Sequence, residues 1–229
     1  MKVAIMQPYF FPYIGYWQLI NMVDIFVIYD DVNFIKKGYV NRNNILLNNK
    51  RYRITLELLG ASQNKLINEI SLGSNGSNIL KTIKQAYSKA PYFSNVYDLL
   101  EKIMTNEEKN LGLFLEKLIK NVSSYIGIDT KFIRSSDLRK DNDLRGQDKI
   151  LQICQLFDAD TYINAIGGKE LYDKQSFFDK DISLSFIESE IVEYPQFGNE
   201  FCAYLSIVDV LMFNSVSEIK KMLNNYKLV

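Results

Sequence analysis

Hydrophobic and polar positions divide the chain into a first α/β segment, a helical middle and a second α/β segment. Residues 2–6 and 24–29 are short runs of β-forming residues, and residues 14–22 between them have the apolar pattern of a helix. A strand, a helix and a second strand in this order predict two parallel strands of an open sheet.

A β-hairpin and a group of helices are predicted to follow. Residues 45–47 and 52–56 flank the turn Asn48-Asn49-Lys50, which is a typical hairpin pattern. In residues 76–126, apolar side chains recur at three- and four-residue intervals in three separate runs, which predict three helices. We therefore expect a helical insertion at residues 76–126 within a single domain of residues 1–229.

The remaining pattern completes an α/β fold. Further strands are expected at residues 67–72, 131–134, 161–164 and 183–187. Helices are expected at residues 148–157, 205–213 and 216–226, and Ser215 with Glu218 forms a capping box for the last of them. The predicted fold class is α/β, with a Rossmann-like, mainly parallel sheet, a helical insertion and C-terminal helices.

Composition narrows the classes of function. The 27 basic and 27 acidic residues balance, so charge gives no basis for nucleic-acid binding. No apolar run reaches the roughly 18 residues that span a bilayer, and no signal peptide precedes the first strand, so we expect a cytoplasmic protein without membrane insertion. Cys154 and Cys202 are isolated among apolar residues, as buried thiols of a reducing compartment are.

The chain contains no histidine. This excludes a Ser-His-Asp or Cys-His nucleophile, a histidine general base and histidine metal ligands. Two separated cysteines do not form a structural zinc motif. We therefore expect no metal site and no resident cofactor, and any chemistry has to use Asp, Glu, Lys, Arg, Tyr or Ser side chains or positioning alone.

Three predicted strands end in polar or irregular segments: Gln7-Pro8-Tyr9, Asp30-Asp31 and Asn164-Ala165-Ile166-Gly167-Gly168. In a parallel sheet these carboxyl ends lie at one edge, where open α/β folds bind ligands. The loop of residues 7–13 contains two prolines and four large aromatic residues. Such a loop either lines a binding site for a sugar or a base, or folds onto its own core.

Charged residues follow the second of these strand ends. Asp30 or Asp31 is a candidate general base, with a pKa raised by partial burial. Lys37 and Arg42 are candidates to hold a diphosphate, Arg42 as a bidentate fork. The alternative is a solvated charged loop closed by an Asx-type turn.

Other turns carry further candidates. Arg145-Gly146-Gln147-Asp148 precedes a helix whose free N–H groups either bind an anion or are capped by a polar side chain. Gly167-Gly168 either lets a ligand approach the backbone closely or forms a tight turn. Asp209 lies in an apolar helix, where we expect it to pair with a cation or to cap a backbone loop rather than to act in catalysis. The candidate substrate-binding residues are Gln7, Tyr9, Tyr13, Tyr16, Lys37, Asn41, Arg42, Asn43, Gln147, Gly167, Gly168 and Gln196.

Six motifs of the chain carry a family resemblance. They are MQPYFFPYIGYW at 6–17, DDVNFIKKGYVNRN at 30–43, GQDKI at 146–150, YINAIGG at 162–168, EYPQFG at 193–198 and LSIVDVLMFN at 205–214. Together and in this order they resemble the WbqC-like family over essentially the whole chain. The resemblance implies a bacterial protein of O-antigen, capsule or other surface-glycan biosynthesis. Many members have His where this chain has Met6, and we interpret that position as not essential.

The resemblance further implies transfer of glycine or another acyl group to an amino sugar. We expect an N-acyltransferase that acts on a nucleotide-linked amino sugar and takes the acyl group from a donor such as acyl-CoA. In this interpretation Asp30 or Asp31 accepts the proton of the amine. Asn164 and the backbone amides of Gly167 and Gly168 stabilise the developing oxyanion.

The sugar or the base is expected to pack on Tyr9, Tyr13 and Tyr16. Two other functions stay open. The first is a non-catalytic nucleotide-sugar binding or partner protein of the same pathway. The second is nucleotidyl transfer. Tyr13-Ile14-Gly15-Tyr16 stands where nucleotidyltransferase-like folds carry H-I-G-H, but tyrosine replaces both histidines, which argues against this function. The expected partners are the nucleotide-linked amino sugar and the acyl donor, and homodimer formation is left open.

Overall fold

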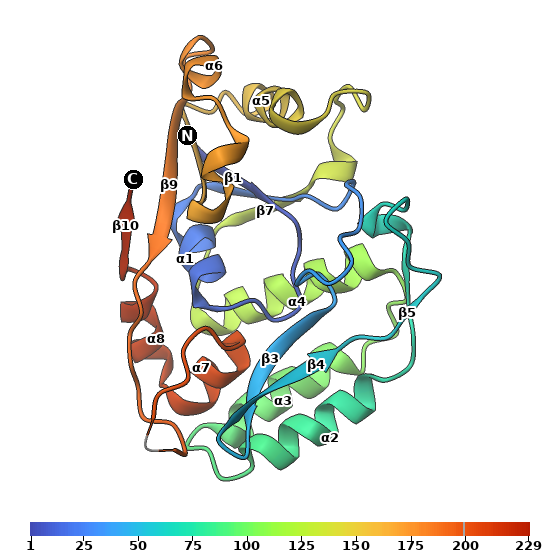
Figure 1. Cartoon of the computed structure of the whole chain (residues 1–229), viewed down its shortest axis with the longest axis vertical. Coiled ribbons are helices and arrows are strands. Elements are labelled where there is room, and N and C mark those ends of the chain that lie inside the picture. Colours follow the sequence, from blue (N-terminus) through green and yellow to red (C-terminus); the bar gives the residue numbers. More distant parts are fainter. Residues whose placement is uncertain (199) are drawn as a thin grey trace.

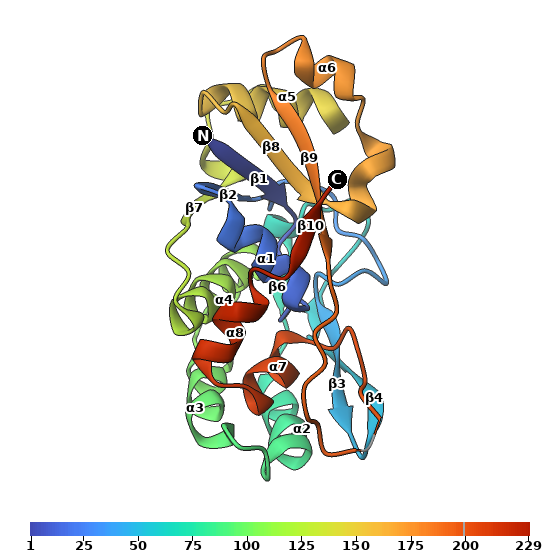
Figure 2. The ribbon, with the colours of Figure 1, turned by 90° about the vertical axis from the view of Figure 1, so that its left-hand side faces the viewer.

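The computed structural model describes every residue of the chain except Asn199. Its central element is a six-stranded sheet in the order β10-β9-β8-β1-β2-β7 (Figure 1; Figure 2). Five strands run parallel, and β10 is antiparallel at one edge. The strands are β1 (Lys2–Met6), β2 (Ile25–Ile28), β7 (Lys131–Arg134), β8 (Thr161–Ala165), β9 (Ser183–Ser189) and β10 (Tyr226–Leu228). The predicted α/β class with a mainly parallel sheet is confirmed.

Two apolar cores cover the two faces of the sheet, because side chains alternate along each strand. Ala4 of β1 belongs to the larger core, which contains the buried residues of α1 (Ile14–Met22). Val3 and Ile5 of the same strand belong to the smaller core, which contains the buried residues of α5 (Gly146–Leu156). Figure 1 shows α5 on the other side of the sheet from α1.

The chain changes its direction of growth in the sheet beside the first strand. From β1 it adds β2 and β7 on one side, and it then crosses over to add β8 and β9 on the other side. Open α/β folds bind ligands at such a switch point, in the crevice beyond the carboxyl ends of the strands. The ends of β1, β2 and β8 lie at this one edge, as predicted.

The chain between β2 and β7 forms a long insertion. It contains a hairpin and three helices: β3 (Arg42–Leu47), β4 (Lys50–Thr55), α2 (Gly76–Tyr87), α3 (Phe93–Met104) and α4 (Leu111–Ile126). Their buried side chains pack with those of α1, α7 (Ile207–Phe213) and α8 (Val216–Met222) in the larger core. In Figure 1 the hairpin and α2 lie at the lower end of the molecule. None of the helices in the described part of the chain has the length and apolar character that a membrane span requires.

The strand predicted at residues 67–72 is wrong. A 3-10 turn occupies Ile67–Glu69, and only Ser71–Leu72 (β6) pairs, with the equally short β5 (Leu58–Leu59). The backbone instead bonds to the segment that follows β2. The Ile67 N–H donates to the Val32 carbonyl at 2.9 Å, and the Asn68 N–H donates to the Asp30 carbonyl at 3.0 Å. These long-range hydrogen bonds replace the ladder that the apolar pattern predicted.

The helix predicted at residues 216–226 is shorter than expected. The capping box of Ser215 and Glu218 starts α8 as predicted, but the helix ends at Met222. The Gln18 side chain donates to the carbonyl groups of Met222 (2.8 Å) and Asn225 (2.9 Å), which also accept hydrogen bonds from the backbone N–H groups of Asn225 and Glu190, and the chain then continues as β10 along β9. These contacts are made with segments that are distant in the sequence, so the local pattern did not reveal this end.

Asp209 lies fully buried in α7 without the cation that was predicted as one possible partner. Tyr87 and Tyr194 donate their hydroxyl hydrogens to its two carboxylate oxygens at 2.7 and 2.8 Å, and Gln196 Nε2 donates at 2.7 Å. Burial raises the pKa of Asp209, and these hydrogen bonds oppose the rise. Tyr87 also accepts a hydrogen bond from the Leu46 N–H (2.8 Å), so this cage joins the insertion to the C-terminal segment.

Replacing Tyr87 by phenylalanine should lower the free energy of unfolding by about 1–3 kcal/mol, because the buried Asp209 carboxylate and the Leu46 N–H each lose a partner. Urea denaturation followed by circular dichroism measures the loss. Tyr97→Phe is the matched control, since the Tyr97 hydroxyl makes no hydrogen bond to any described residue. A loss below about 0.5 kcal/mol in Tyr87→Phe would show that the cage does not join the two segments.

Candidate functional site

Two hollows lie among the loops that follow the parallel strands. The first, termed the cleft, has a volume of about 590 Å³ and lies between the end of β2, the turn after β7 and the start of α5. It is lined by Tyr29, Asp31, Val32, Asn33, Leu66, Asn68, Ser136, Asn142, Asp143, Arg145, Gly146 and Lys149. The second, termed the tyrosine hollow, has a volume of about 250 Å³ and is lined by Tyr9, Pro12, Tyr13, Tyr39, Asn43 and Tyr204.

Asp31 binds two buried lysines at the wall of the cleft. Its Oδ2 lies 2.8 Å from Lys140 Nζ and 3.1 Å from Lys149 Nζ, and both lysine side chains are at most 5% exposed. The Lys149 ammonium also lies 5.4 Å from the centre of the Tyr29 ring. Burial raises the pKa of Asp31, but hydrogen bonds, the strongest from Lys140, outweigh burial and hold the pKa below its ordinary value. The raised pKa predicted for this carboxyl is therefore wrong.

Asp30 has no exposed surface. Its Oδ1 accepts a hydrogen bond from the Ser136 N–H (3.0 Å), and its Oδ2 accepts one from the Ser136 hydroxyl (2.7 Å). Burial raises the pKa of Asp30, as predicted for a candidate base. The Asp30 carboxylate, however, joins the end of β2 to the turn after β7 through these hydrogen bonds. Of the two aspartates, only Asp31 lines the cleft.

The sequence analysis missed both lysines. Lys149 belongs to the motif GQDKI and lies on the buried side of α5 beside Ile150 and Ile153. A lysine on the apolar face of a predicted helix was the signal that could have identified it. Lys140 lies in the loop between β7 and α5, where no periodic pattern marks a buried position. The motif DDVNFIKKGYVNRN thus meets the motif GQDKI through Asp31 and Lys149.

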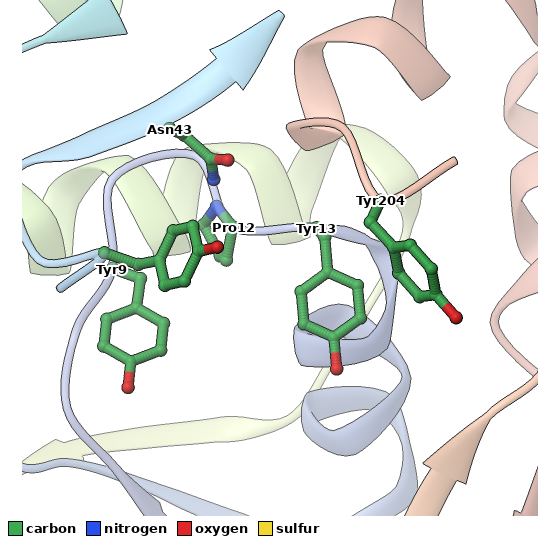
Figure 3. Close-up of a pocket in the computed structure, with 6 residues that line it drawn as sticks. Tyr9, Pro12, Tyr13, Asn43 and Tyr204 are labelled. Carbon is green, nitrogen blue, oxygen red and sulfur yellow. The ribbon is translucent and has the colours of Figure 1, made fainter. Parts of the chain in front are cut away.

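The tyrosine hollow is formed by two pairs of rings. The ring centres of Tyr9 and Tyr39 are 6.2 Å apart, and those of Tyr13 and Tyr204 are 6.4 Å apart. Figure 3 shows Tyr9 on one side and Tyr13 with Tyr204 on the other, with Pro12 and Asn43 behind them. Tyr9 and Tyr13 therefore line a hollow, and Tyr39 and Tyr204, which the sequence analysis did not select, complete it.

The loop after β1 divides its aromatic residues between the hollow and the core. Phe10 and Phe11 have no exposed surface, and Tyr16 is 3% exposed. The Tyr16 hydroxyl donates to the Gln7 carbonyl at 2.9 Å, so this tyrosine closes the loop from inside. Because Tyr16 is buried, the prediction that it packs on a ligand is wrong. The two alternatives predicted for the loop both apply, since some of its aromatic residues line a hollow and others lie in the core.

The Phe11 carbonyl anchors this loop. It accepts hydrogen bonds from Asn43 Nδ2 (2.7 Å) and from the Ser206 hydroxyl (2.8 Å). The next carbonyl, that of Pro12, accepts from Trp17 Nε1 at 3.0 Å. Phe11 itself adopts a φ of 43°, which is rare for a bulky side chain. Asn43, a predicted substrate ligand, therefore holds the loop in place with its amide group.

The two candidates for diphosphate binding, Lys37 and Arg42, and the candidate substrate ligand Asn41 lie outside both hollows. Asn41 Nδ2 donates to the Leu56 carbonyl (2.9 Å), and Arg42 Nε donates to the Gly38 carbonyl (3.0 Å). Lys37 is exposed. The structure thus does not place these three side chains beside Asp31.

Two predicted glutamines bind other parts of the protein. Gln147 Oε1 accepts a hydrogen bond from the Asp173 N–H (2.6 Å) at the start of α6 (Lys174–Phe178). Gln196 donates to Asp209 and to the Cys202 carbonyl and accepts from the Cys202 N–H. The Gln196 amide is therefore fully engaged in holding the C-terminal segment.

Asn164 and the glycine pair lie at the end of β8. Asn164 Oδ1 accepts a hydrogen bond from the Ala165 N–H (2.8 Å), and a Cβ on Gly168 would lie 2.7 Å from Asn164 Nδ2. A side chain at position 168 would therefore require the Asn164 side chain to shift, whereas nothing lies within 4 Å of a Cβ placed on Gly167. Two strand spacings, about 10 Å, separate the ends of β8 and β2. Asn164 lines neither the cleft nor the tyrosine hollow.

Replacing Asp31 by asparagine should lower the free energy of unfolding at pH 7 by about 3–5 kcal/mol, because two buried ammonium groups lose their counter-ion. Adding Lys140→Met should restore part of this loss. Because the folded-state pKa of Asp31 is depressed, its contribution is present above the ordinary value of 3.8 and is lost as the pH falls through the lower folded-state pKa. Urea denaturation at several pH values measures both effects, and an equal loss with and without Lys140→Met would contradict the pairing.

Comparisons with known proteins place the chain in a family. No solved structure matches it significantly. The "Uncharacterized protein Rv1507c" of Mycobacterium tuberculosis is 28% identical over 222 residues, which are 95% of each chain. The model of the WbqC-like protein family matches residues 7–221, a range that includes both hollows. The chain therefore belongs to the WbqC-like protein family.

Proposed function

We propose that this chain transfers an acyl group to the amine of a nucleotide-linked amino sugar in surface-glycan biosynthesis. One observation carries the proposal: two motifs of the chain meet at Asp31 and Lys149, in a cleft of about 590 Å³ beyond the end of β2. Concave sites at this edge are where α/β proteins bind small ligands. Membership of the WbqC-like family supports the proposal through the surface-glycan setting that the sequence motifs imply.

Acyl transfer to an amine needs the uncharged nitrogen, because an ammonium group has no free electron pair. The ionised Asp31 carboxylate attracts the ammonium form, and Asp31 lines the cleft. In the proposed step the ammonium group gives one proton to Asp31, and the free amine attacks the acyl carbonyl carbon of the donor. As the C–N bond forms and the C–S bond of acyl-CoA breaks, the nitrogen loses a second proton, which the leaving thiolate takes up to give the free thiol.

The position of Met6 is consistent with a reaction that does not need the histidine found there in many family members. Its side chain is half-buried and packs against the larger core. It lines neither the cleft nor the tyrosine hollow. Chemistry that depends on Asp31 is therefore compatible with methionine at this position.

One observation favours a second candidate, binding of a nucleotide sugar without chemistry. The lysine contacts keep the pKa of Asp31 low, and a carboxylate with a low pKa holds a proton weakly. Such a group is better suited to bind an ammonium ion than to remove its proton. The two candidates differ in one measurable property, the formation of an acylated product.

The purified chain should acylate a nucleotide-linked amino sugar, with release of free thiol from acetyl-CoA and a matching mass increase of the sugar. Asp31→Asn should reduce kcat by about 100-fold or more and change KM little, since the lost step is proton transfer. Mass spectrometry and a thiol reagent measure product and rate. The assays use a temperature at which circular dichroism shows each variant to be folded.

Asp98→Asn, which removes an exposed carboxylate on α3, is the control and should retain full turnover. Unchanged turnover in both Asp30→Asn and Asp31→Asn would exclude these carboxylates as the base. Binding of the nucleotide sugar without acylation by any thioester or glycyl donor would favour the second candidate. A requirement for a nucleoside triphosphate and Mg²⁺ would instead identify nucleotidyl transfer.

A further inference from the structure

The tyrosine hollow combines three segments that are far apart in the sequence. Tyr9 and Tyr13 follow β1, Tyr39 lies between β2 and β3, and Tyr204 precedes α7. Tyr39 and Tyr204 are 54% and 59% exposed, although both rings contact another tyrosine of the hollow. Exposed aromatic rings that converge on one hollow are typical of a surface on which a ligand ring stacks.

Two residues with a strained backbone lie at this hollow or next to it. Seven described residues other than glycine have a positive φ, and the two aromatic ones are Phe11 (43°) and Tyr204 (56°). Tyr204 is a wall of the hollow, and Phe11 directly precedes the lining residue Pro12. Bulky residues reach this conformation only when their surroundings enforce it, and such strain clusters at binding sites. The hydrogen bonds from Asn43 and Ser206 to the Phe11 carbonyl hold the loop that carries Tyr9 and Tyr13 in this conformation.

The lining selects an uncharged ligand group. None of the described residues that line the hollow is acidic or basic, and burial raises the pKa of Tyr9 and Tyr13, so their phenols stay neutral at physiological pH. The Asn43 amide is already used, because its Nδ2 donates to two carbonyls of the loop and its Oδ1 accepts from the Asn44 N–H. The hollow therefore offers ring faces and phenol hydroxyls, and no free planar polar group that would pair with sugar hydroxyls.

The size of the hollow fits one ring. Its volume of about 250 Å³ lies below the roughly 300–1,000 Å³ of sites that enclose a whole drug-sized ligand. A flat heterocycle stacks on aromatic side chains without charge pairing, because every nucleobase has a π-face. The segment from Asp31 to Tyr39 connects the cleft to the hollow along the chain, and the Phe10 N–H donates to the Tyr39 carbonyl at 3.0 Å.

We propose that the tyrosine hollow binds the nucleobase of the substrate. The identification of the ring as a nucleobase rests on the nucleotide-linked substrate of the proposed function. In this proposal the base stacks among Tyr9, Tyr13, Tyr39 and Tyr204, and the amino sugar occupies the cleft that Asp31 lines. The two hollows thus divide the substrate into a part that gives affinity and a part that reacts.

Free nucleosides test this assignment without an acyl donor. Saturation-transfer NMR at millimolar uridine, cytidine, adenosine and guanosine should detect binding of at least one nucleoside, and titration gives its affinity. Tyr39→Ala and Tyr204→Ala should each weaken that affinity by about 10-fold or more, which is the effect of losing one stacking ring. Tyr52→Ala is the matched control, because Tyr52 is a 46% exposed tyrosine on β4 outside the hollow.

The outcomes separate this inference from the acyltransferase proposal. Absence of nucleoside binding, or equal affinity in the wild type, Tyr39→Ala and Tyr204→Ala, would overturn the base site. Binding of the methyl glycoside of glucosamine that is lost in the same two variants, without nucleoside binding, would assign the hollow to the sugar and overturn it as well. Nucleoside binding that depends on both tyrosines supports the base site even if no acyl donor gives a product.

Discussion

Two hydrogen bonds to the carbonyl oxygen of Phe11 hold the loop on which the tyrosine hollow depends. They come from Asn43 (2.7 Å) and Ser206 (2.8 Å), side chains that are more than 160 residues apart in the sequence. With these bonds Phe11 keeps a φ of 43°, and its ring turns into the core. Because this part of the loop faces inward, Tyr9 and Tyr13 are free to line the tyrosine hollow.

Buried carboxylates connect the same edge of the sheet to the rest of the molecule. Asp30 is stabilised by a serine, Asp31 by two lysines and Asp209 by two tyrosines and a glutamine. A buried carboxylate is costly unless such partners are present, so each of these groups specifies one arrangement of the segments around it. Asp30 and Asp31 join β2 to the β7–α5 connection, and Asp209 joins the insertion to the C-terminal segment that carries Tyr204.

The fold could largely be predicted from the sequence, because its elements follow local patterns. The short apolar runs identified the parallel strands, and the capping box at Ser215 identified the start of α8. β10 was missed because its residues pair with the distant strand β9, a tertiary contact that the local pattern does not show. At the site, strand order alone placed Asp31 at the ligand edge. Lys140 and Tyr204 could not be found in this way, since they come from irregular loops whose position depends on tertiary contacts.

The most direct test of a nucleotide-sugar site at this edge is a thermal-unfolding screen against nucleotide-linked amino sugars, their separate nucleotides and amino sugars, and acyl-CoA. A ligand at about 100 times its Kd stabilises a protein by roughly 2.7 kcal/mol, which corresponds to about 5–10 °C for a chain of this size. The account predicts a larger shift with the intact nucleotide-linked amino sugar than with either part alone. No shift with any nucleotide or sugar at millimolar concentration would contradict it.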